Sequence, residues 1–179
     1  ARPVVVDAFT GRTDSLPGGS EHVWVGTVTS DHAGMVYGSG RVLCYFDFKT
    51  RRSWFLTSRG RVPTGARVPT DAIYGFGPVL LPSGYLLYVR QGGAGTLVAL
   101  PVESGTLRPI GEPVQIGTNI RYGNLGPAQY VATREGFVVM ASTQGSGRLA
   151  FVARSRSGAT DSLAFPPADY GTFELSPDG

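Results

Sequence analysis

The apolar positions of this chain form short runs of about four to eight residues, which is the usual length of a strand. Segments rich in glycine, proline and polar residues separate the runs, and apolar residues at helical spacing are nearly absent. The runs are rich in Val, Leu, Tyr and Phe, which favour strands. The pattern therefore predicts an all-β fold with many turns.

Two stretches of the chain align on each other without gaps. Val79 to Val89 and Val131 to Ala141 each read as a strand, a polar turn that ends in glycine, and a second strand. The turn glycines are Gly84 and Gly136. We interpret them as structural, because a tight hairpin needs the positive φ that glycine adopts most easily.

The alignment extends beyond the two hairpins. A third apolar run begins twelve residues after each turn glycine, at Thr96 and at Arg148, so we expect one register over three strands. Fourth strands are expected at 106–110 and 160–165, each after a Ser-Gly turn. Each copy is thus predicted to be a four-stranded antiparallel meander.

Weaker copies flank these two. We expect a part-unit over 1–17, full units over 22–57, 74–110 and 128–165, and the start of another over 172–179. A four-stranded sheet cannot bury both faces alone, and radial stacking of such sheets produces a β-propeller. The chain is therefore predicted to be an interior slice of a propeller, with about three full blades and part-blades at both ends.

A short motif closes the chain after an apolar run: Ser176, Pro177, Asp178 and Gly179. With Gly111-Glu112-Pro113-Val114 and the run 147–152 before it, this motif resembles WD40-like PD40 repeats of the TolB type. The order resembles that in the C-terminal propeller region of bacterial receptor-like serine/threonine protein kinases, and it is closest over residues 72–179. Only the final copy keeps the full motif.

The resemblance implies a sensory or interaction module that lies outside the kinase domain, often beyond a membrane span. This would favour an extracytoplasmic location, in the periplasm or at the cell surface. The chain itself contains no phosphate-binding glycine loop, catalytic Asp motif or Asp-Phe-Gly. We therefore expect no phosphoryl transfer from this segment.

Charge and cysteine content narrow the classes of partner. The net charge is +3, with fifteen arginines, the single lysine Lys49 and thirteen acidic residues scattered among them, so we do not expect a nucleic-acid surface. Cys44 is the only cysteine, which excludes an intrachain disulfide and a multi-cysteine metal site. No apolar run approaches the roughly 20 residues that cross a bilayer, so no membrane insertion is expected in this segment.

Residues with catalytic potential are few. The two histidines are His22 and His32, and the pair Asp31-His32 is a poor dyad because neighbours in an extended chain point to opposite sides. A Gly-x-Ser-x-Gly elbow is absent, and the Gly-x-Gly-x-x-Ala at 145–150 precedes a strand-like run instead of the required helix. We therefore expect no catalytic site, no metal and no cofactor.

Aromatic residues within the strand runs are expected to pack between sheets instead of stacking on a ligand. They are Trp24, Tyr45, Phe46, Trp54 and Phe151.

Loops at one end of the sheets are the expected recognition surface. In a propeller, the connections between blades (58–74, 117–127, 166–171) and the hairpins between second and third strands (91–95, 142–147) emerge on the same face. The stretch 48–70 contains no acidic residue, and its arginines suit bidentate contacts to an acidic peptide or other anion. The candidate binding residues are Arg59, Arg61, Arg67, Tyr74, Arg121 and Tyr122.

The leading hypothesis is a non-enzymatic binding or sensor module that recognises a protein or peptide, as part of a bacterial signalling protein. The alternative is the propeller portion of a larger serine hydrolase or peptidase, where it would gate substrate access. A lectin-like carbohydrate binder is a third hypothesis, and it needs aromatic side chains exposed on one face. Unpaired strand edges would also allow self-association.

Overall fold

The computed structural model describes the chain in segments, and the account below concerns these alone: residues 4–6, 13–15, 23–29, 31–64, 67–90, 95–122, 128–133, 136, 138–143, 149–155, 157–166, 168 and 173. All regular elements in these segments are strands, which confirms the predicted all-β class. No helix in the described part of the chain is long and apolar enough to cross a membrane.

The strands form three antiparallel sheets of four or five strands and one separate hairpin. In each sheet the strands follow one another in chain order, as a meander. The hairpin pairs β1 (Val4–Val6) with β2 (Thr13–Ser15). The first sheet contains β3 (Val23–Val28), β4 (Gly34–Ser39), β5 (Val42–Asp47), β6 (Arg52–Thr57) and β7 (Gly60–Pro63).

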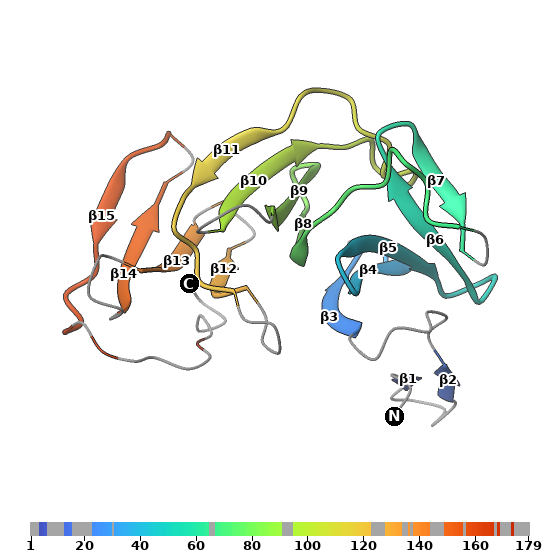
Figure 1. Ribbon diagram of the computed structural model, residues 1–179, viewed down its shortest axis with the longest axis horizontal. Helices are drawn as coiled ribbons and strands as arrows, with labels where there is room; N and C mark the ends of the chain where they lie inside the picture. Colours follow the sequence, from blue (N-terminus) through green and yellow to red (C-terminus); the bar gives the residue numbers. More distant parts are fainter. Residues whose placement is uncertain are drawn as a thin grey trace.

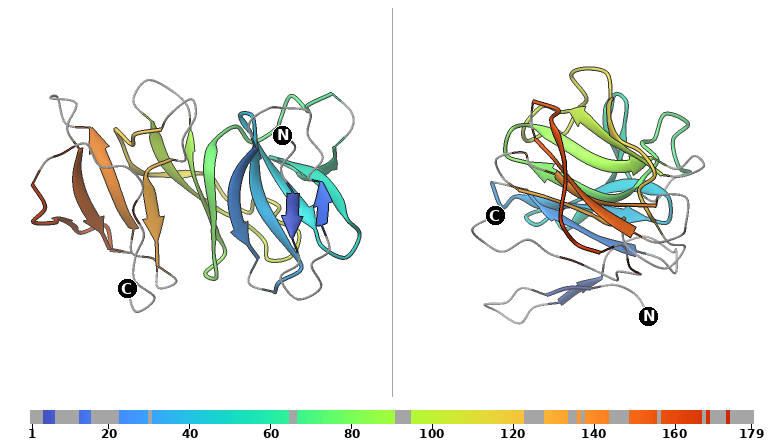
Figure 2. Two further views of the ribbon diagram at one scale, coloured as in Figure 1. Left: turned by 90° about the horizontal axis from the view of Figure 1, so that it is seen from below. Right: turned by 90° about the vertical axis from the view of Figure 1, so that its left-hand side faces the viewer.

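The other two sheets each have four strands. The second sheet contains β8 (Phe76–Leu81), β9 (Tyr85–Arg90), β10 (Thr96–Pro101) and β11 (Val114–Gly117). The third sheet contains β12 (Tyr130–Ala132), β13 (Val138–Thr143), β14 (Leu149–Arg154) and β15 (Thr160–Ser162). Figure 1 shows the three sheets following one another along an arc, with β3, β8 and β12 on its concave side; Figure 2 shows β1 and β2 beside the first sheet.

The second sheet is buried on both faces. Successive side chains of a strand point to opposite faces, and in β9 this alternation sends Leu86 and Tyr88 toward the first sheet and Leu87 and Val89 toward the third. All four are at most 5% exposed. The unbroken apolar run of β9 is therefore explained by two separate cores, one on each side of the same strand.

A bulge in β8 connects the second sheet to both neighbours. The register of β8 against β9 shifts between Phe76 and Val79, and Gly77 has φ 56°. The carbonyl oxygen of Pro78 accepts a hydrogen bond of 3.2 Å from Thr27 Oγ1 on β3, and the carbonyl oxygen of Gly77 accepts one from Tyr130 Oη on β12. The bulge thus supplies one acceptor to each adjacent sheet.

The outer faces of the first and third sheets also carry apolar clusters. Tyr37, Cys44 and Phe46 are at most 1% exposed on the face of the first sheet that is turned away from the second. On the third sheet the ring of Phe151 lies edge-on to Phe165 and Phe173, with centroids 5.7 and 4.8 Å away.

Tyr45, Phe46 and Phe151 are each at most 8% exposed. The predicted packing between sheets is confirmed for Tyr45, which lies in the core between the first and second sheets, whereas Phe46 and Phe151 lie in the clusters on the outer faces. Trp54 is half-buried against the core between the first and second sheets. The side chain of Trp24 lies outside the described residues.

The first sheet has a fifth strand that the sequence did not suggest. β7 lies within the stretch 58–74 that we expected to be a connection, and it pairs with β6 through a tight turn. Thr57 holds this turn: its Oγ1 accepts a hydrogen bond from the Arg59 amide and donates one to the Gly60 carbonyl. A side chain that bonds to nearby backbone in this way stabilises a turn without any apolar signal.

The expected fourth strand at 106–110 is wrong, because β11 lies further along the chain. Residues 103–108 instead form a closed turn, in which the Leu107 amide donates to the Glu103 carbonyl (2.9 Å) and the Glu103 amide donates to the Arg108 carbonyl (2.8 Å). Leu107 adopts φ 57° and is 2% exposed in the core between the first and second sheets. Burial of this leucine takes the place of the expected strand pairing.

The expectation of one register over three strands is also wrong for the third strand. Leu80 pairs with Leu86 and Ala132 with Val138, so the first two strands of the copies are offset by 52 residues. On the third strand, Leu86 pairs with Leu100 whereas Val138 pairs with Arg154, and the offset becomes 54. Arg154 is therefore the structural counterpart of Leu100.

Candidate ligand-binding groove

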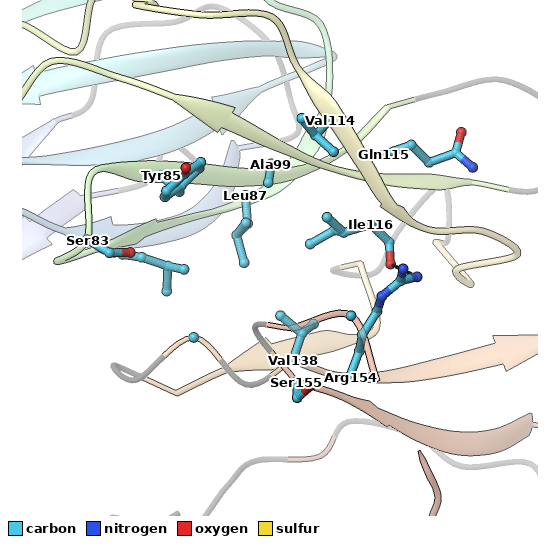
Figure 3. Close-up of a pocket in the computed structure, with 13 residues that line it drawn as sticks. Ser83, Tyr85, Leu87, Ala99, Val114, Gln115, Ile116, Val138, Arg154 and Ser155 are labelled. Carbon is cyan, nitrogen blue, oxygen red and sulfur yellow. Dashed lines mark hydrogen bonds between the residues drawn. The ribbon is translucent and has the colours of Figure 1, made fainter. Parts of the chain in front are cut away.

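A groove of about 370 Å³ lies between the second and third sheets (Figure 3). We call it the inter-sheet groove. Its lining comes from both sheets and from the turns at one end of them: Leu81, Ser83, Tyr85, Leu87, Ala99, Val114, Gln115, Ile116, Gly136, Val138, Arg154, Ser155 and Gly158.

The groove exists because the second and third sheets differ in the connection that follows their third strand. In the second sheet, a twelve-residue connection between β10 and β11 folds back and buries Leu107 against the first sheet. In the third sheet, the connection between β14 and β15 is the five-residue stretch 155–159, which has no large apolar side chain. Its turn is closed by hydrogen bonds between Ser155 and both Gly158 and Ala159, each 2.9 Å. The space that Leu107 fills at one interface is therefore open at the next.

The apolar part of the groove is continuous with the core. Leu81, Leu87, Ala99 and Val138 line it and are also members of the cluster between the second and third sheets. Their exposure is between 2% and 8%, so they are held by packing. In Figure 3, Leu87 and Ala99 lie on one wall and Val138 on the facing wall. These residues form a packed apolar base for the groove.

Among the described residues of the lining, Arg154 is the one with a charged side chain. It pairs with Val138 across β13 and β14, so it lies on the face of the third sheet that is turned toward the groove. Its Nη1 donates a hydrogen bond of 2.7 Å to the carbonyl oxygen of Ile116 on β11. Figure 3 shows the guanidinium reaching Ile116 from the opposite wall.

The guanidinium of Arg154 has capacity beyond this bond. It carries five N–H donors. Within the described residues, no carboxylate forms an ion pair with it, and the other polar groups of the lining are the neutral side chains of Ser83, Tyr85, Gln115 and Ser155. The groove can therefore offer a ligand apolar contact, neutral hydrogen bonds and one half-buried positive charge.

The arginines predicted for recognition lie elsewhere. Arg59 and Arg61, together with Arg108, line a hollow of about 380 Å³ between the first and second sheets. Arg67 is exposed in the connection that leads to β8 and is not part of that lining.

Acidic side chains accompany these arginines in space, although the stretch 48–70 has none. Asp47 and Glu103 line the same hollow, and Glu103 Oε2 lies 3.6 Å from Arg108 Nε. Arg59 Nε lies 4.0 Å from Asp71 Oδ2, with the Arg59 side chain 91% exposed. The Arg61 guanidinium carbon lies 4.5 Å from the ring centroid of Tyr45.

The aromatic candidates also lie apart from each other. Tyr74 is 48% exposed and forms a β-bridge to Val42, next to the first sheet. Tyr122 stacks on Phe76 at 5.3 Å and belongs to the packing between the second and third sheets. Arg121 precedes it, and its backbone amide donates to the carbonyl of Ala141 (3.4 Å). The structure thus does not bring the six candidates together: Arg59 and Arg61 line the hollow between the first and second sheets, and Tyr122 packs between the second and third.

The described parts of 58–74, 117–127 and 91–95 emerge at one end of the sheets, as we expected, whereas most of 142–147 and 166–171 lies outside the described residues. The Ile120 amide, in the connection to the third sheet, donates to the Gly95 carbonyl beside the β9–β10 turn (3.0 Å). The Gly75 amide, in the connection to the second sheet, likewise donates to the carbonyl oxygen of Arg41 at the β4–β5 turn (2.9 Å). The inter-sheet groove opens at the opposite end, among the turns at Ser83, Gly136 and Ser155.

The turn glycines have the conformation that we inferred. Gly84 has φ 81° and Gly136 has φ 91°, and their amides close the turns on Leu81 and Thr133. The motif Ser176, Pro177, Asp178 and Gly179 lies outside the described residues.

The pair Asp31-His32 lies in an exposed turn. Hydrogen bonds from Thr29 and from the amide of Ala33 lower the pKa of Asp31. His22 lies outside the described residues.

Sequence reasoning missed the groove because it compared the copies for likeness alone. Arg154 is a charged residue at a position where the preceding copy has a buried leucine, Leu100. In the ungapped sequence alignment Arg154 falls opposite Val102, which is also apolar, so a search for charged residues opposite apolar ones would have selected it.

Comparisons of the chain with protein-family models, curated proteins and solved structures find no match.

Proposed function

We propose that this chain is a segment of a β-propeller and acts as a recognition module, with the inter-sheet groove as its binding site. The observation that carries the proposal is the second sheet: it is a four-stranded meander with a core on each face and its first strand bonded to the first strands of both neighbours. Radial stacking of meanders buries both faces in this way.

The family assignment is part of the same proposal. The Ser-Pro-Asp-Gly motif and the glycine turns at Gly84 and Gly136 support blades of the PD40 or TolB type. A role beside a bacterial receptor-like kinase, outside the cytoplasm and without catalysis by this segment, follows from that resemblance. The ligand would be a protein, a peptide or a smaller molecule that presents acidic character to Arg154.

Ligand mapping by NMR tests the recognition site. Amide spectra of the chain are recorded with a library of small apolar, polar and charged compounds, and the compounds are examined afterwards for chemical change. We expect intact compounds and shifts that cluster at Leu87, Val138 and Arg154. Shifts confined to other surfaces, or conversion of a compound by the chain, would overturn the proposal.

The propeller itself is tested by an experimental structure in which every sheet is traced. Successive sheets related by rotation about one axis would support it. Sheets packed in parallel layers, or paired face to face as a sandwich, would overturn it.

A further inference from the structure

We infer that the inter-sheet groove binds a carboxylate attached to an apolar group, and that Arg154 holds the carboxylate. The inference deepens the proposed function and rests on it, since it names the chemistry of the ligand for the same groove. Two sources share this chemistry: a free aliphatic acid and the C-terminal end of a peptide with an apolar last residue.

The charge of Arg154 is the first argument. Its counterpart Leu100 is 4% exposed, so the third sheet has a guanidinium where the second has a buried leucine. A half-buried cation loses hydration and needs compensation from a partner. Within the described residues that compensation is the neutral carbonyl oxygen of Ile116, at 2.7 Å. An anion in the groove would complete it.

The geometry of the guanidinium favours a carboxylate. Its planar fork donates two parallel hydrogen bonds to the two oxygens of one carboxylate group. Nη1 is engaged by Ile116, and Nη2 lies toward Gly158, 3.8 Å from the position that a Cβ there would take. Glycine at 158 therefore leaves room beside the donor.

The rest of the lining selects the remainder of the ligand. Val114 and Tyr85 line the groove at 58% and 37% exposed and offer apolar surface to a ligand, above the buried base formed by Leu81, Leu87, Ala99 and Val138. Burial of apolar ligand surface there is favourable because it removes that surface from water. The groove, at about 370 Å³, is at the small end of the range of roughly 300 to 1,000 Å³ for ligand sites. It therefore suits a short chain or one terminal residue.

A phosphate ester is the competing anion. A doubly charged phosphate is usually held by several cationic or backbone N–H donors. The described lining contains one arginine and no lysine. The single charge of a carboxylate is the better match.

The test compares ligands that differ only in the head group. Octanoate, octanamide and octyl phosphate are titrated into the chain by NMR, and N-acetyl-leucine is added as a mimic of a peptide terminus. We expect octanoate or N-acetyl-leucine to bind in the groove at least tenfold more tightly than octanamide. Tighter octanoate identifies a free acid, and tighter N-acetyl-leucine identifies a peptide end.

Three variants assign the effect to Arg154. Arg154→Gln should weaken carboxylate binding at least tenfold, and Arg154→Lys should weaken it less because the charge remains. Arg154→Leu restores the residue of the preceding copy, so it should fold and lose carboxylate binding. Arg90→Gln changes an exposed arginine on β9 that is outside the lining, and it should leave affinity unchanged.

The outcomes separate the two proposals. Equal binding of octanoate and octanamide in the groove, or no loss on Arg154→Gln, overturns the carboxylate inference and leaves the groove as a recognition site. Tighter octyl phosphate overturns it in favour of a phosphate site. Absence of groove shifts with all four probes also overturns it, and the proposed function then depends on the wider library.

Discussion

Replacement of Leu107 by alanine and by glycine should separate two opposing contributions of this residue to stability. Its side chain is 2% exposed in the core between the first and second sheets, whereas its backbone has φ 57°, in the left-handed region. Removal of a buried leucine side chain costs about 2–5 kcal/mol, and a left-handed conformation costs a residue with a Cβ about 1–2 kcal/mol. Burial therefore outweighs the backbone strain in the native protein.

The two variants lose the same packing and differ in strain. Glycine is normally about 0.5–1 kcal/mol less favourable than alanine because the unfolded chain has more freedom. At position 107 alanine keeps the strain and glycine relieves it. We therefore expect Leu107→Gly to be equal to Leu107→Ala or up to about 1 kcal/mol more stable, with both well below the native protein.

Urea denaturation followed by circular dichroism measures the free energies of unfolding. Leu86 is the matched control, because it is 0% exposed in the same core and is paired on both sides within strand β9. There the glycine variant should be the less stable of the pair, by about 0.5–1 kcal/mol. The reasoning is refuted if glycine is less stable than alanine by the same margin at both positions. In a melting experiment, a difference of 1 kcal/mol corresponds to about 2–4 °C for a chain of this size.

Four further outcomes are expected. Tyr130→Phe leaves the Gly77 carbonyl without its donor and should lower the free energy of unfolding by about 1–3 kcal/mol in urea; an unchanged value would contradict the inter-sheet bond. Burial raises the pKa of Cys44 to about 12 from 9.0, so iodoacetamide at pH 8 should label it only after unfolding, and fast labelling of the native protein would be inconsistent with the buried site. Between about pH 9 and pH 12 the thiol of Cys44 keeps its proton in the folded protein and loses it in the unfolded chain. The contribution of Cys44 to the free energy of unfolding is therefore complete below about pH 9 and declines as the pH rises toward 12. The Cys44→Ala variant should lose less stability than the native protein over that range. A Cβ at Gly26 would lie 1.4 Å from the Val36 carbonyl oxygen, so Gly26→Ala should fail to form the native first sheet, and a native-like spectrum would disprove that close approach.

Most strands were predictable because their side chains are buried on both faces of the sheet, which leaves an unbroken run of apolar residues in the sequence. Runs such as 85–89 and 97–101 are apolar over their length, and the glycine turns between runs recur. The edge strands β7 and β11 carry no such signal. β7 and β11 are four residues each, and most of their side chains are exposed or half-exposed, so they resemble loops in sequence.

The candidate site was harder to predict because it depends on contacts between distant residues. The stretch 48–70 is free of acid in sequence, but folding brings Asp71 and Glu103 to its arginines and to Arg108. The groove likewise depends on a short turn at 155–159 in place of a longer connection. An alignment of the repeats identifies the residues that they share, so it does not detect a connection that differs in length between them.

The bulge in β8 has a consequence for how such a chain can gain or lose repeats. Its two freed carbonyls are bonded from opposite sides, by Thr27 of the preceding sheet and Tyr130 of the following one. A meander cut out at this point would leave acceptors unsatisfied, and one inserted there would need a hydroxyl donor at each of its two boundaries. Duplication or deletion of a repeat is therefore tolerated only when matching donors come with it. The sequence of each repeat must then suit the particular repeats on either side of it.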